Sequence, residues 1–229
     1  MERVALVSGG NRGIGREVAR QLAAEGYRVV IGSRDLEQGE QVARELGENV
    51  TARQLDVTDE ESIVRCVASV ADDLGRLDVL VNNAGIAGGG WSTHAVDADL
   101  DEVRRTLETN LFGAWRTTLA FLPLLRGSPH PRVVNVSSGS GSLAEMGAGT
   151  PAYSVSKAAL NALTRILSAE LRPDRVLVNA VCPGWVATDM GGAGGRPVAE
   201  GAASVTWAVL LDDDGPTGGF FRDGRPVAW

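Results

Sequence analysis

The chain has 229 residues, of which 44% are hydrophobic and 22% charged, and its formal net charge is −7 at pH 7. This composition is typical of a globular protein with one substantial core, and the negative charge argues against a nucleic-acid-binding surface. No apolar run reaches the roughly 20 residues that span a membrane, and no signal peptide is visible. We therefore expect a cytoplasmic protein with neither a nucleic-acid nor a membrane partner.

A disulfide or a metal site would need cysteines or histidines, and the chain has two of each: Cys66, Cys182, His94 and His130. The cysteines are far apart and form no C-x-x-C motif, and no pair has the spacing of metal ligands. We expect reduced core thiols and no metal site.

Short runs rich in β-branched residues alternate with helical patterns along the whole chain. The runs predict strands at residues 3–7, 28–31, 51–55, 78–81, 132–136, 175–181 and 219–221. The patterns between them predict a first helix that stops by Gly26, and then helices at residues 36–46, 59–74, 100–125, 152–171 and 198–211. Thr58 is the expected N-cap of the third helix, Pro123 is an expected interruption of the fourth, and residues 86–97 are expected to form a loop.

This alternation indicates the α/β class. We predict a Rossmann-like, doubly wound parallel sheet of about seven strands with helices on both faces, in a single domain that spans residues 1–229.

A glycine-rich turn with the spacing G-x-x-x-G-x-G, at Gly9, Gly13 and Gly15, joins the first strand to the first helix. Glycines let the backbone approach a pyrophosphate, and a helix N-terminus favours its negative charge. An ordinary connecting loop is the alternative. The position directly after the first strand favours a dinucleotide site.

The end of the second strand bears on which dinucleotide binds. Arg34 follows this strand, and Arg12 lies in the glycine-rich turn. Two guanidinium groups can bind a 2′-phosphate, whereas an acidic residue usually holds the ribose hydroxyl of NAD. We favour NADP(H) over NAD(H). The alternatives are that Asp35 holds a ribose or that these residues are solvated loop charges.

Polar and small residues follow the later strands. Asp56, Asn82 to Gly85, Ser138 and the sequence Cys182-Pro183-Gly184 all come directly after predicted strands. Because the carboxyl ends of parallel strands share one edge of a sheet, we expect these residues to meet there. Ordinary turns are the alternative, because asparagine and glycine favour turns.

Tyr153 and Lys157 are four residues apart, so a helix places them on one face. An ammonium beside a phenol lowers the pKa of the phenol and makes it a general acid or base. Ser138 could bind the same carbonyl oxygen as Tyr153, and Ser137 is a competing candidate. A buried tyrosine and a surface lysine that share a helix by chance are the alternative.

Taken together, these motifs resemble the short-chain dehydrogenase/reductase family in its single-domain form. The resemblance rests on the glycine-rich turn, the segment 82–85, Asn110, Ser138, the Tyr153-x-x-x-Lys157 motif and Pro183-Gly184. Within the family, residues 11–15, 33–35 and 183–190 are most similar to NADPH-dependent carbonyl reductases.

The resemblance implies a role for each matching position. Tyr153 would be the general acid/base, and Lys157 would lower its pKa and bind the nicotinamide ribose. Ser138 would hold the substrate oxygen, and Asn110 would anchor a proton-relaying water. Asp56 and Val57 would line the adenine, Asn82 the adenosine side, and Thr188 the carboxamide. The implied cofactor-binding residues are Gly9, Asn11, Arg12, Gly13, Ile14, Gly15, Arg34, Asp56, Val57, Asn82, Ala84, Gly85, Tyr153, Lys157, Pro183, Gly184, Val186 and Thr188.

The sequence departs from the family pattern in two places that matter. The gap between Ser138 and Tyr153 is two residues longer than usual, which leaves Ser137, Ser138 and Ser140 as candidates for the catalytic serine. The loop after Met190 is short and glycine-rich where relatives often carry a helical lid, which implies an open site.

The expected function is NADPH-dependent reduction of a small-molecule ketone or aldehyde. The alternatives are an NAD-dependent alcohol dehydrogenase of the same family and, less favoured, a cofactor-sensing protein without turnover. An enoyl reductase is disfavoured by the Tyr–Lys spacing. The apolar helices at 100–125 and 152–171 and the habits of the family imply a homodimer or homotetramer.

Overall fold

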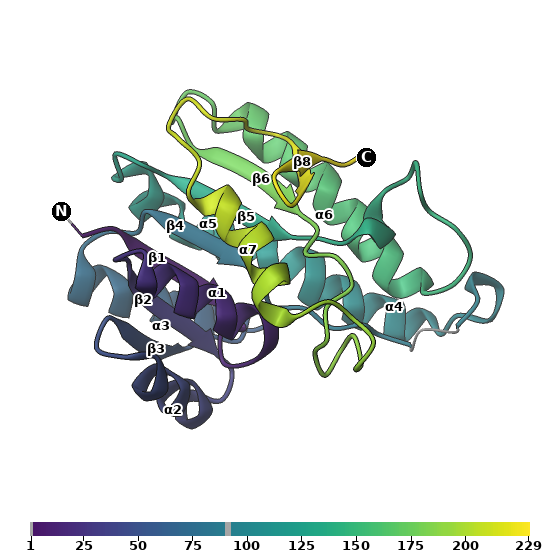
Figure 1. Ribbon diagram of the computed structural model, residues 1–229, viewed down its shortest axis with the longest axis horizontal. Coiled ribbons are helices and arrows are strands. Elements are labelled where there is room, and N and C mark those ends of the chain that lie inside the picture. The colour runs from purple at the N-terminus through teal and green to yellow at the C-terminus, as the bar shows by residue number, and fades with distance from the viewer. Residues whose placement is uncertain (1, 90–92) are drawn as a thin grey trace.

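The structure is a computed structural model, and it describes residues 2–89 and 93–229. In Figure 1 a twisted sheet lies between two layers of helices, and the C-terminal segment returns beside the last long strand. Part of the expected loop at 86–97, including Gly90 and Trp91, lies outside the described residues. Its last residues, Ala95–Asp97, form a 3₁₀ turn.

The described residues form one eight-stranded sheet in the order β3-β2-β1-β4-β5-β6-β7-β8. The strands are β1 Val4–Ser8, β2 Arg28–Ser33, β3 Val50–Gln54, β4 Val79–Asn82, β5 Arg132–Val136, β6 Leu177–Val181, β7 Phe220–Arg222 and β8 Arg225–Pro226. All neighbours are parallel except β7 and β8. The seven predicted strands are confirmed, and β8 is too short to leave a sequence pattern. The strand order reverses between β1 and β4, where such sheets bind ligands.

Alternate residues of the strands point to opposite faces of the sheet and pack into two hydrophobic cores, as expected for a parallel sheet covered on both faces. Ala5 and Val7 pack with α1 Gly13–Ala24, α2 Leu36–Leu46 and α7 Val198–Val209. Val4 and Leu6 pack with α3 Glu60–Leu74, α5 Ala114–Arg126 and α6 Pro151–Glu170. Helix α4, Leu100–Leu107, packs along α6.

The predicted long helix at 100–125 is confirmed as one continuous helical stretch, in which α4 and α5 are joined by a wider π-helical turn at Glu108–Gly113. The expected interruption at Pro123 is wrong, because Pro123 lies inside α5 without ending it. Within this turn, Gly113 packs so closely on the loop after β3 that a Cβ there would lie 2.7 Å from Val57 Cγ2. The wider turn therefore lies at a tertiary contact and not at the proline.

The predicted cap of α3 is also wrong. Asp59 is the N-cap, because its carboxylate accepts a hydrogen bond from the backbone N–H of Glu61 at 3.0 Å. The Thr58 hydroxyl instead donates to Asp56 Oδ1 at 2.7 Å.

The expectation of buried, unbridged thiols is confirmed for Cys66 and Cys182. Burial raises the pKa of Cys66 to about 12, as befits an inert core thiol. Across the described residues we find no group of three or more potential metal ligands. None of the helices described is both long and apolar enough to cross a membrane.

Candidate active site

The glycine-rich turn is fastened to the end of β4 by one asparagine. Asn83 Nδ2 donates to the carbonyl oxygens of Ser8 at 2.9 Å and Gly9 at 3.1 Å, and its backbone N–H donates to Ser8 Oγ at 3.0 Å. A Cβ on Gly15 would clash with Asn83 Nδ2 and Gly9 O. Only glycine lets α1 start this close to the strand ends.

The N-terminus of α1 is open to a ligand. Helix α1 begins at Gly13, and its N-cap residue, Arg12, makes no side-chain capping hydrogen bond. Gly9 and Gly13 have φ angles of 62° and 53°, a region that glycine adopts without strain. The first-turn N–H groups therefore keep donors for an anion, and the cradle fits the pyrophosphate of a dinucleotide.

Two arginines and one aspartate lie beside this cradle. Arg12 Nη1 is 3.4 Å from the Asp189 carboxylate, and both side chains are largely exposed. Arg34 is exposed directly after β2. Asp35 is the N-cap of α2, and its carboxylate accepts the backbone N–H of Gln38 at 3.1 Å. The aspartate has a structural role, whereas the arginines present positive charge at the surface.

The side chain of Asn82, expected on the adenosine side of a cofactor, is turned into the protein. Its Nδ2 donates to Thr118 Oγ1 and to Asn135 Oδ1, each at 2.9 Å, and the residue is buried. The side chain therefore links β4 to β5 and α5 inside the protein. Any contact of Asn82 with a cofactor would have to use its backbone.

The two residues expected at the adenine differ in their surroundings. Asp56 closes a turn, because its Oδ1 accepts the backbone N–H of Thr58 at 2.9 Å as well as the Thr58 hydroxyl. Val57 is buried against Gly113 in the core. The side chain of Val57 is thus committed to packing, and Asp56 remains at the edge of the sheet.

Asn110 connects the segment after β4 to α6. Its side-chain amide donates to Ile86 O at 2.9 Å and Ser156 Oγ at 3.0 Å, and its Oδ1 accepts the N–H of Ile86 at 2.8 Å. A Cβ on Gly85 would lie 3.2 Å from Asn110 Oδ1 and 3.6 Å from Lys157 Nζ. Gly85 thus leaves room beside the lysine. The expected water-anchoring role of Asn110 stays a prediction.

Lys157 is buried beside Tyr153. Its Nζ donates to Val136 O at 2.8 Å and lies 5.6 Å from the centre of the Tyr153 ring. Burial lowers the pKa of Lys157 to about 8. Burial also raises the pKa of Tyr153 to about 12, although a hydrogen bond with Ser138 acts in the opposite direction.

The expectation of a lowered phenol pKa is therefore wrong for the protein on its own. The reason is that removal from water penalises the phenolate more than its polar neighbours stabilise it.

The hydrogen-bond partners of the candidate serines show which of them lies beside Tyr153. Ser138 makes the hydrogen bond with Tyr153, and Ser138 Oγ also accepts the backbone N–H of Ser140 at 3.2 Å. Ser137 is buried, and its hydroxyl donates to Asn161 Oδ1 at 2.6 Å. Ser138 is the serine that is placed beside the phenol.

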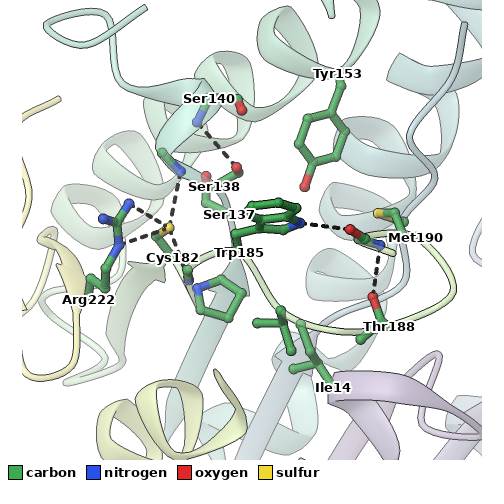
Figure 2. A pocket seen from close by; sticks show the side chains of 15 residues that line it. Ile14, Ser137, Ser138, Ser140, Tyr153, Cys182, Trp185, Thr188, Met190 and Arg222 are labelled. Atoms are coloured by element: carbon green, nitrogen blue, oxygen red, sulfur yellow. Dashed lines mark hydrogen bonds between the residues drawn. The ribbon is translucent and has the colours of Figure 1, made fainter. Parts of the chain in front are cut away.

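These residues border a cavity of about 470 Å³ at the carboxyl ends of β5 and β6 (Figure 2). Its predicted lining residues are Ile14, Ser137, Ser138, Ser140, Tyr153, Pro183, Gly184, Val186 and Thr188. Cys182, expected at this edge of the sheet with Pro183 and Gly184, also lines it. The lining residues that the sequence did not indicate are Gly139, Trp185, Met190, Gly191 and Arg222. Figure 2 shows the Tyr153 hydroxyl pointing toward the space above Trp185 and the loop that carries Met190. Trp185 follows the Pro183-Gly184 motif, which could have indicated it, whereas nothing near Arg222 in the sequence did.

The loop after β6 closes one side of this cavity and reaches the glycine-rich turn. A Cβ on Gly13 would lie 3.5 Å from Thr188 Cγ2, and Thr188 Oγ1 accepts the N–H of Gly191 at 3.1 Å. Trp185 Nε1 donates to Gly191 O at 2.7 Å, while the tryptophan remains 67% exposed. Thr188 therefore lies where the turn meets the cavity.

Comparison with known proteins agrees with this arrangement. Residues 3–196 match the short chain dehydrogenase family. The chain is 38% identical to (+)-neomenthol dehydrogenase of Arabidopsis thaliana, over 96% of this chain and 95% of that protein. It is 34% identical to salutaridine reductase of Papaver bracteatum, over 96% and 94% of the two chains. The alignment with the Arabidopsis protein extends over 284 positions, more than the 229 residues here, so that relative carries segments that this chain lacks.

Two solved structures are similar over essentially the full length. The NADPH-bound carbonyl reductase from chicken fatty liver has a TM-score of 0.89 and 29% identity, over 100% of this chain and 99% of that one. Carbonyl reductase Sniffer of D. melanogaster also has a TM-score of 0.89, with 30% identity over both whole chains. With the family match, the sheet order and the Tyr153–Lys157 helix, these likenesses establish that the chain belongs to the short-chain dehydrogenase/reductase family, whose oxidoreductases act on alcohol and carbonyl groups.

Proposed function

We propose that the protein is an NADPH-dependent carbonyl reductase that converts a ketone or aldehyde to an alcohol, with Tyr153 as the general acid. One observation carries the proposal. Ser138 and Tyr153 are hydrogen-bonded to each other at the wall of a cavity of about 470 Å³, and the buried Lys157 lies behind them.

The two hydroxyl groups suit the recognition of one carbonyl oxygen. NADPH, when bound, supplies the hydride. The Ser138 hydroxyl donates to the carbonyl oxygen and orients it, and Tyr153 transfers its proton as negative charge develops on that oxygen. A phenol whose pKa is raised to about 12 keeps its proton at neutral pH, so it is present as an acid when the reduction begins. Lys157, with a pKa of about 8, is largely protonated there and holds a positive charge near the phenol.

The backbone cradle fits a dinucleotide, as the uncapped start of α1 and the space at Gly85 indicate. We assign the pyrophosphate to the first turn of α1 and the nicotinamide ribose to Lys157 beside Gly85. Arg12 and Arg34 would bind the 2′-phosphate of NADPH. Asp35 is engaged as the cap of α2, which weakens the alternative of an NAD-dependent alcohol dehydrogenase.

A panel of aromatic and aliphatic aldehydes and ketones, followed by the loss of NADPH absorbance, tests the proposal. We expect turnover with at least one class and a higher kcat/KM with NADPH than with NADH. Binding of NADPH without any turnover would favour the cofactor-sensing alternative. A higher kcat/KM with NADH would favour the NAD-dependent dehydrogenase.

The same proposal includes self-association through the helices α5 and α6. These helices expose the apolar side chains Trp115, Leu119, Val155 and Ile166. Light scattering after size exclusion should give a dimer or tetramer, and a monomer would contradict this part of the proposal.

A further inference from the structure

A third polar side chain follows Tyr153 and Lys157 along the same face of α6. Asn161 comes four residues after Lys157, as Lys157 comes four residues after Tyr153, so the three side chains lie one helical turn apart. Asn161 is buried, and a buried amide is costly unless its polar atoms are hydrogen-bonded. The partners of Asn161 therefore indicate what this side chain does.

Both ends of the Asn161 amide hold the segment that contains Ser138. Asn161 Oδ1 accepts the hydroxyl of Ser137 at 2.6 Å, and Asn161 Nδ2 donates to Gly141 O at 3.1 Å. Ser138 lies between these two contacts and is the N-cap of the 3₁₀ turn Gly139–Gly141. One side chain of α6 thus holds the chain on either side of Ser138.

The 3₁₀ turn also packs directly on α6. A Cβ on Gly141 would lie 2.7 Å from the carbonyl carbon of Lys157, so a side chain there would push the turn away from the helix. Lys157 Nζ donates to Val136 O at 2.8 Å, at the end of β5. The helix that carries Tyr153 therefore contacts the segment 136–141 at both of its ends.

The Ser138 hydroxyl depends on its backbone for its orientation. Its Oγ accepts the backbone N–H of Ser140 at 3.2 Å (Figure 2), and it makes the hydrogen bond with Tyr153. A substrate oxygen at these hydroxyls would compete for the bond with Tyr153. The position of Ser138 relative to the phenol must then come from the contacts of the neighbouring residues.

Those contacts come from two elements. On the β6 side, Ser137 N donates to Val181 O at 2.7 Å, and Gly139 N donates to Cys182 Sγ at 3.1 Å. These bonds continue the sheet and fix the segment relative to β6. The bonds to Asn161 fix it relative to α6, and because Tyr153 is on the same helix, they set the separation between the Ser138 and Tyr153 hydroxyls.

We propose that Asn161 is a positioning residue, which holds the Ser138 hydroxyl beside the Tyr153 hydroxyl so that both can bind one carbonyl oxygen. The Tyr153-x-x-x-Lys157 motif would thus continue for one more helical turn, to Asn161. Asn161 is not among the described residues that line the cavity, so it would act through Ser138 and not on the substrate. This inference rests on the proposed reductase function, because it concerns the same site.

A double-mutant cycle tests whether Asn161 acts through Ser138. The single-turnover rate with an aldehyde that the wild type reduces is measured for the wild type, Asn161→Ala, Ser138→Ala and the double variant. We expect Asn161→Ala to lower this rate by about ten- to a hundredfold and to leave the NADPH affinity within about twofold.

The Ser138→Ala background supplies the decisive comparison. Loss of one donor to the reacting oxygen costs about 10²- to 10³-fold, which leaves a rate that single-turnover kinetics can measure. In this background we expect Asn161→Ala to change the rate by less than about twofold, because the group that it positions is already missing. An equal loss in both backgrounds overturns the inference, since a general loss of structure would not depend on Ser138.

Asn179→Ala is the matched control. Asn179 is a buried asparagine of β6 that also holds a loop with both ends of its amide, because Nδ2 donates to Pro216 O at 2.7 Å and Oδ1 accepts Gly219 N at 3.0 Å. Neither Pro216 nor Gly219 is among the described residues that line the cavity. We expect both variants to melt at a lower temperature, but the rate of Asn179→Ala to stay within about twofold of the wild type. A loss equal to that of Asn161→Ala overturns the inference.

Amide hydrogen exchange decides the inference even if no carbonyl is reduced. Exchange at residues 137–142 is followed by mass spectrometry in the wild type and both asparagine variants. We expect it to be about tenfold faster in Asn161→Ala and within about twofold in Asn179→Ala, where residues 217–219 should respond instead. Unchanged exchange at 137–142 in Asn161→Ala overturns the inference. Faster exchange there, together with no turnover by the wild type, counts against the reductase function alone.

Discussion

The glycine-rich turn, to which we assign the cofactor (the cofactor side), and the wall of the cavity, to which we assign the substrate (the substrate side), differ in how they are built. At the turn, backbone atoms and glycines define the surface, as at Gly9, Gly13 and Gly15, and Asn83 fastens them to β4. In the cavity, side chains such as Trp185 and Arg222 form the wall, and they come from a loop and a terminal strand.

This difference has a physical cause. A pyrophosphate is bound by main-chain N–H groups, which every sequence has, so the chain must supply closely spaced glycines at a strand end. A substrate is recognised by particular side chains, and many segments can deliver these. The cofactor side should therefore be sensitive to added atoms, and the substrate side to changed side chains.

The largest effect on activity is expected at Tyr153, which lies between the cofactor side and the substrate side. Tyr153→Phe removes the proton donor and keeps the ring, so kcat should fall by about 10²- to 10⁴-fold while NADPH affinity is retained. Steady-state kinetics and a fluorescence titration measure the two quantities. Tyr27→Phe is the matched control, because Tyr27 packs in the core on the α1 side, where its hydroxyl accepts a hydrogen bond from Arg3 Nη1 at 3.2 Å. Comparable turnover in Tyr153→Phe and the wild type would remove the phenol from the mechanism.

On the cofactor side, Gly15→Ala should break the contact between the turn and β4. The added Cβ clashes with Asn83 Nδ2 and Gly9 O, so the turn must move. We expect a loss of about 1–3 kcal/mol in the free energy of unfolding, together with weaker NADPH binding. Gly147→Ala is the control, because a Cβ there meets nothing within 4 Å. If both variants bound NADPH like the wild type, the turn would not be the cradle.

Burial of Lys157 should make the free energy of unfolding depend on pH. Its pKa is lowered to about 8 in the folded protein, whereas the ordinary pKa of a lysine is 10.5. Between these values the unfolded chain binds more protons, so the free energy of unfolding should rise with pH, by about 2 kcal/mol between pH 8 and pH 10. Below pH 8 the full cost of burying the ammonium remains. Tyr153, with a pKa raised to about 12, acts oppositely only above about pH 10.

Urea unfolding at pH 7.5, 8.5 and 9.5 compares the wild type with Lys157→Met. In Lys157→Met, the free energy of unfolding should lack the increase of about 2 kcal/mol that Lys157 causes between pH 8 and pH 10. Subtracting the free energy of the variant from that of the wild type at each pH removes the contributions of the other titrating groups. A difference that stays constant over this range would mean that the lysine titrates normally.

The smallest effect is expected on the KM for NADPH, from a change of the exposed Arg34 beside the glycine-rich turn. Arg34→Ala should raise the KM for NADPH by about tenfold and leave the KM for NADH nearly unchanged, because only NADPH carries the 2′-phosphate. Arg28→Ala, at the other end of β2, is the control. An equal change for both cofactors would exclude Arg34 from the phosphate site.

The fold was predictable because each strand carries its own apolar run and each turn its own glycine or aspartate. The π-helical turn between α4 and α5 was not, since it lies where Gly113 packs on Val57 from a distant loop. The phenol's pKa was misjudged for a similar reason. The spacing of Tyr153 and Lys157 places them together, but burial depends on the whole fold.

The substrate wall illustrates the same limit. Arg222 reaches Cys182 across 40 residues of sequence, and only the pairing of β6 with β7 brings them together. No sequence motif predicts this contact between Arg222 and Cys182. The glycine-rich turn, in contrast, lies directly between β1 and α1 as its sequence indicates, whereas the side chain of Asn82 turns into the core. The assignment of cofactor-binding residues stays a prediction.

Transfer of hydride to a carbonyl in this cavity is tested most directly with labelled cofactor. Methyl 4-formylbenzoate is reduced with NADPH that carries deuterium at both C4 positions of the nicotinamide, and the alcohol is examined by mass spectrometry and NMR. We expect one deuterium on the carbinol carbon for each NADPH oxidised. NADPH oxidation without deuterium in the alcohol, or no oxidation with this or any carbonyl of the panel, would contradict the assignment.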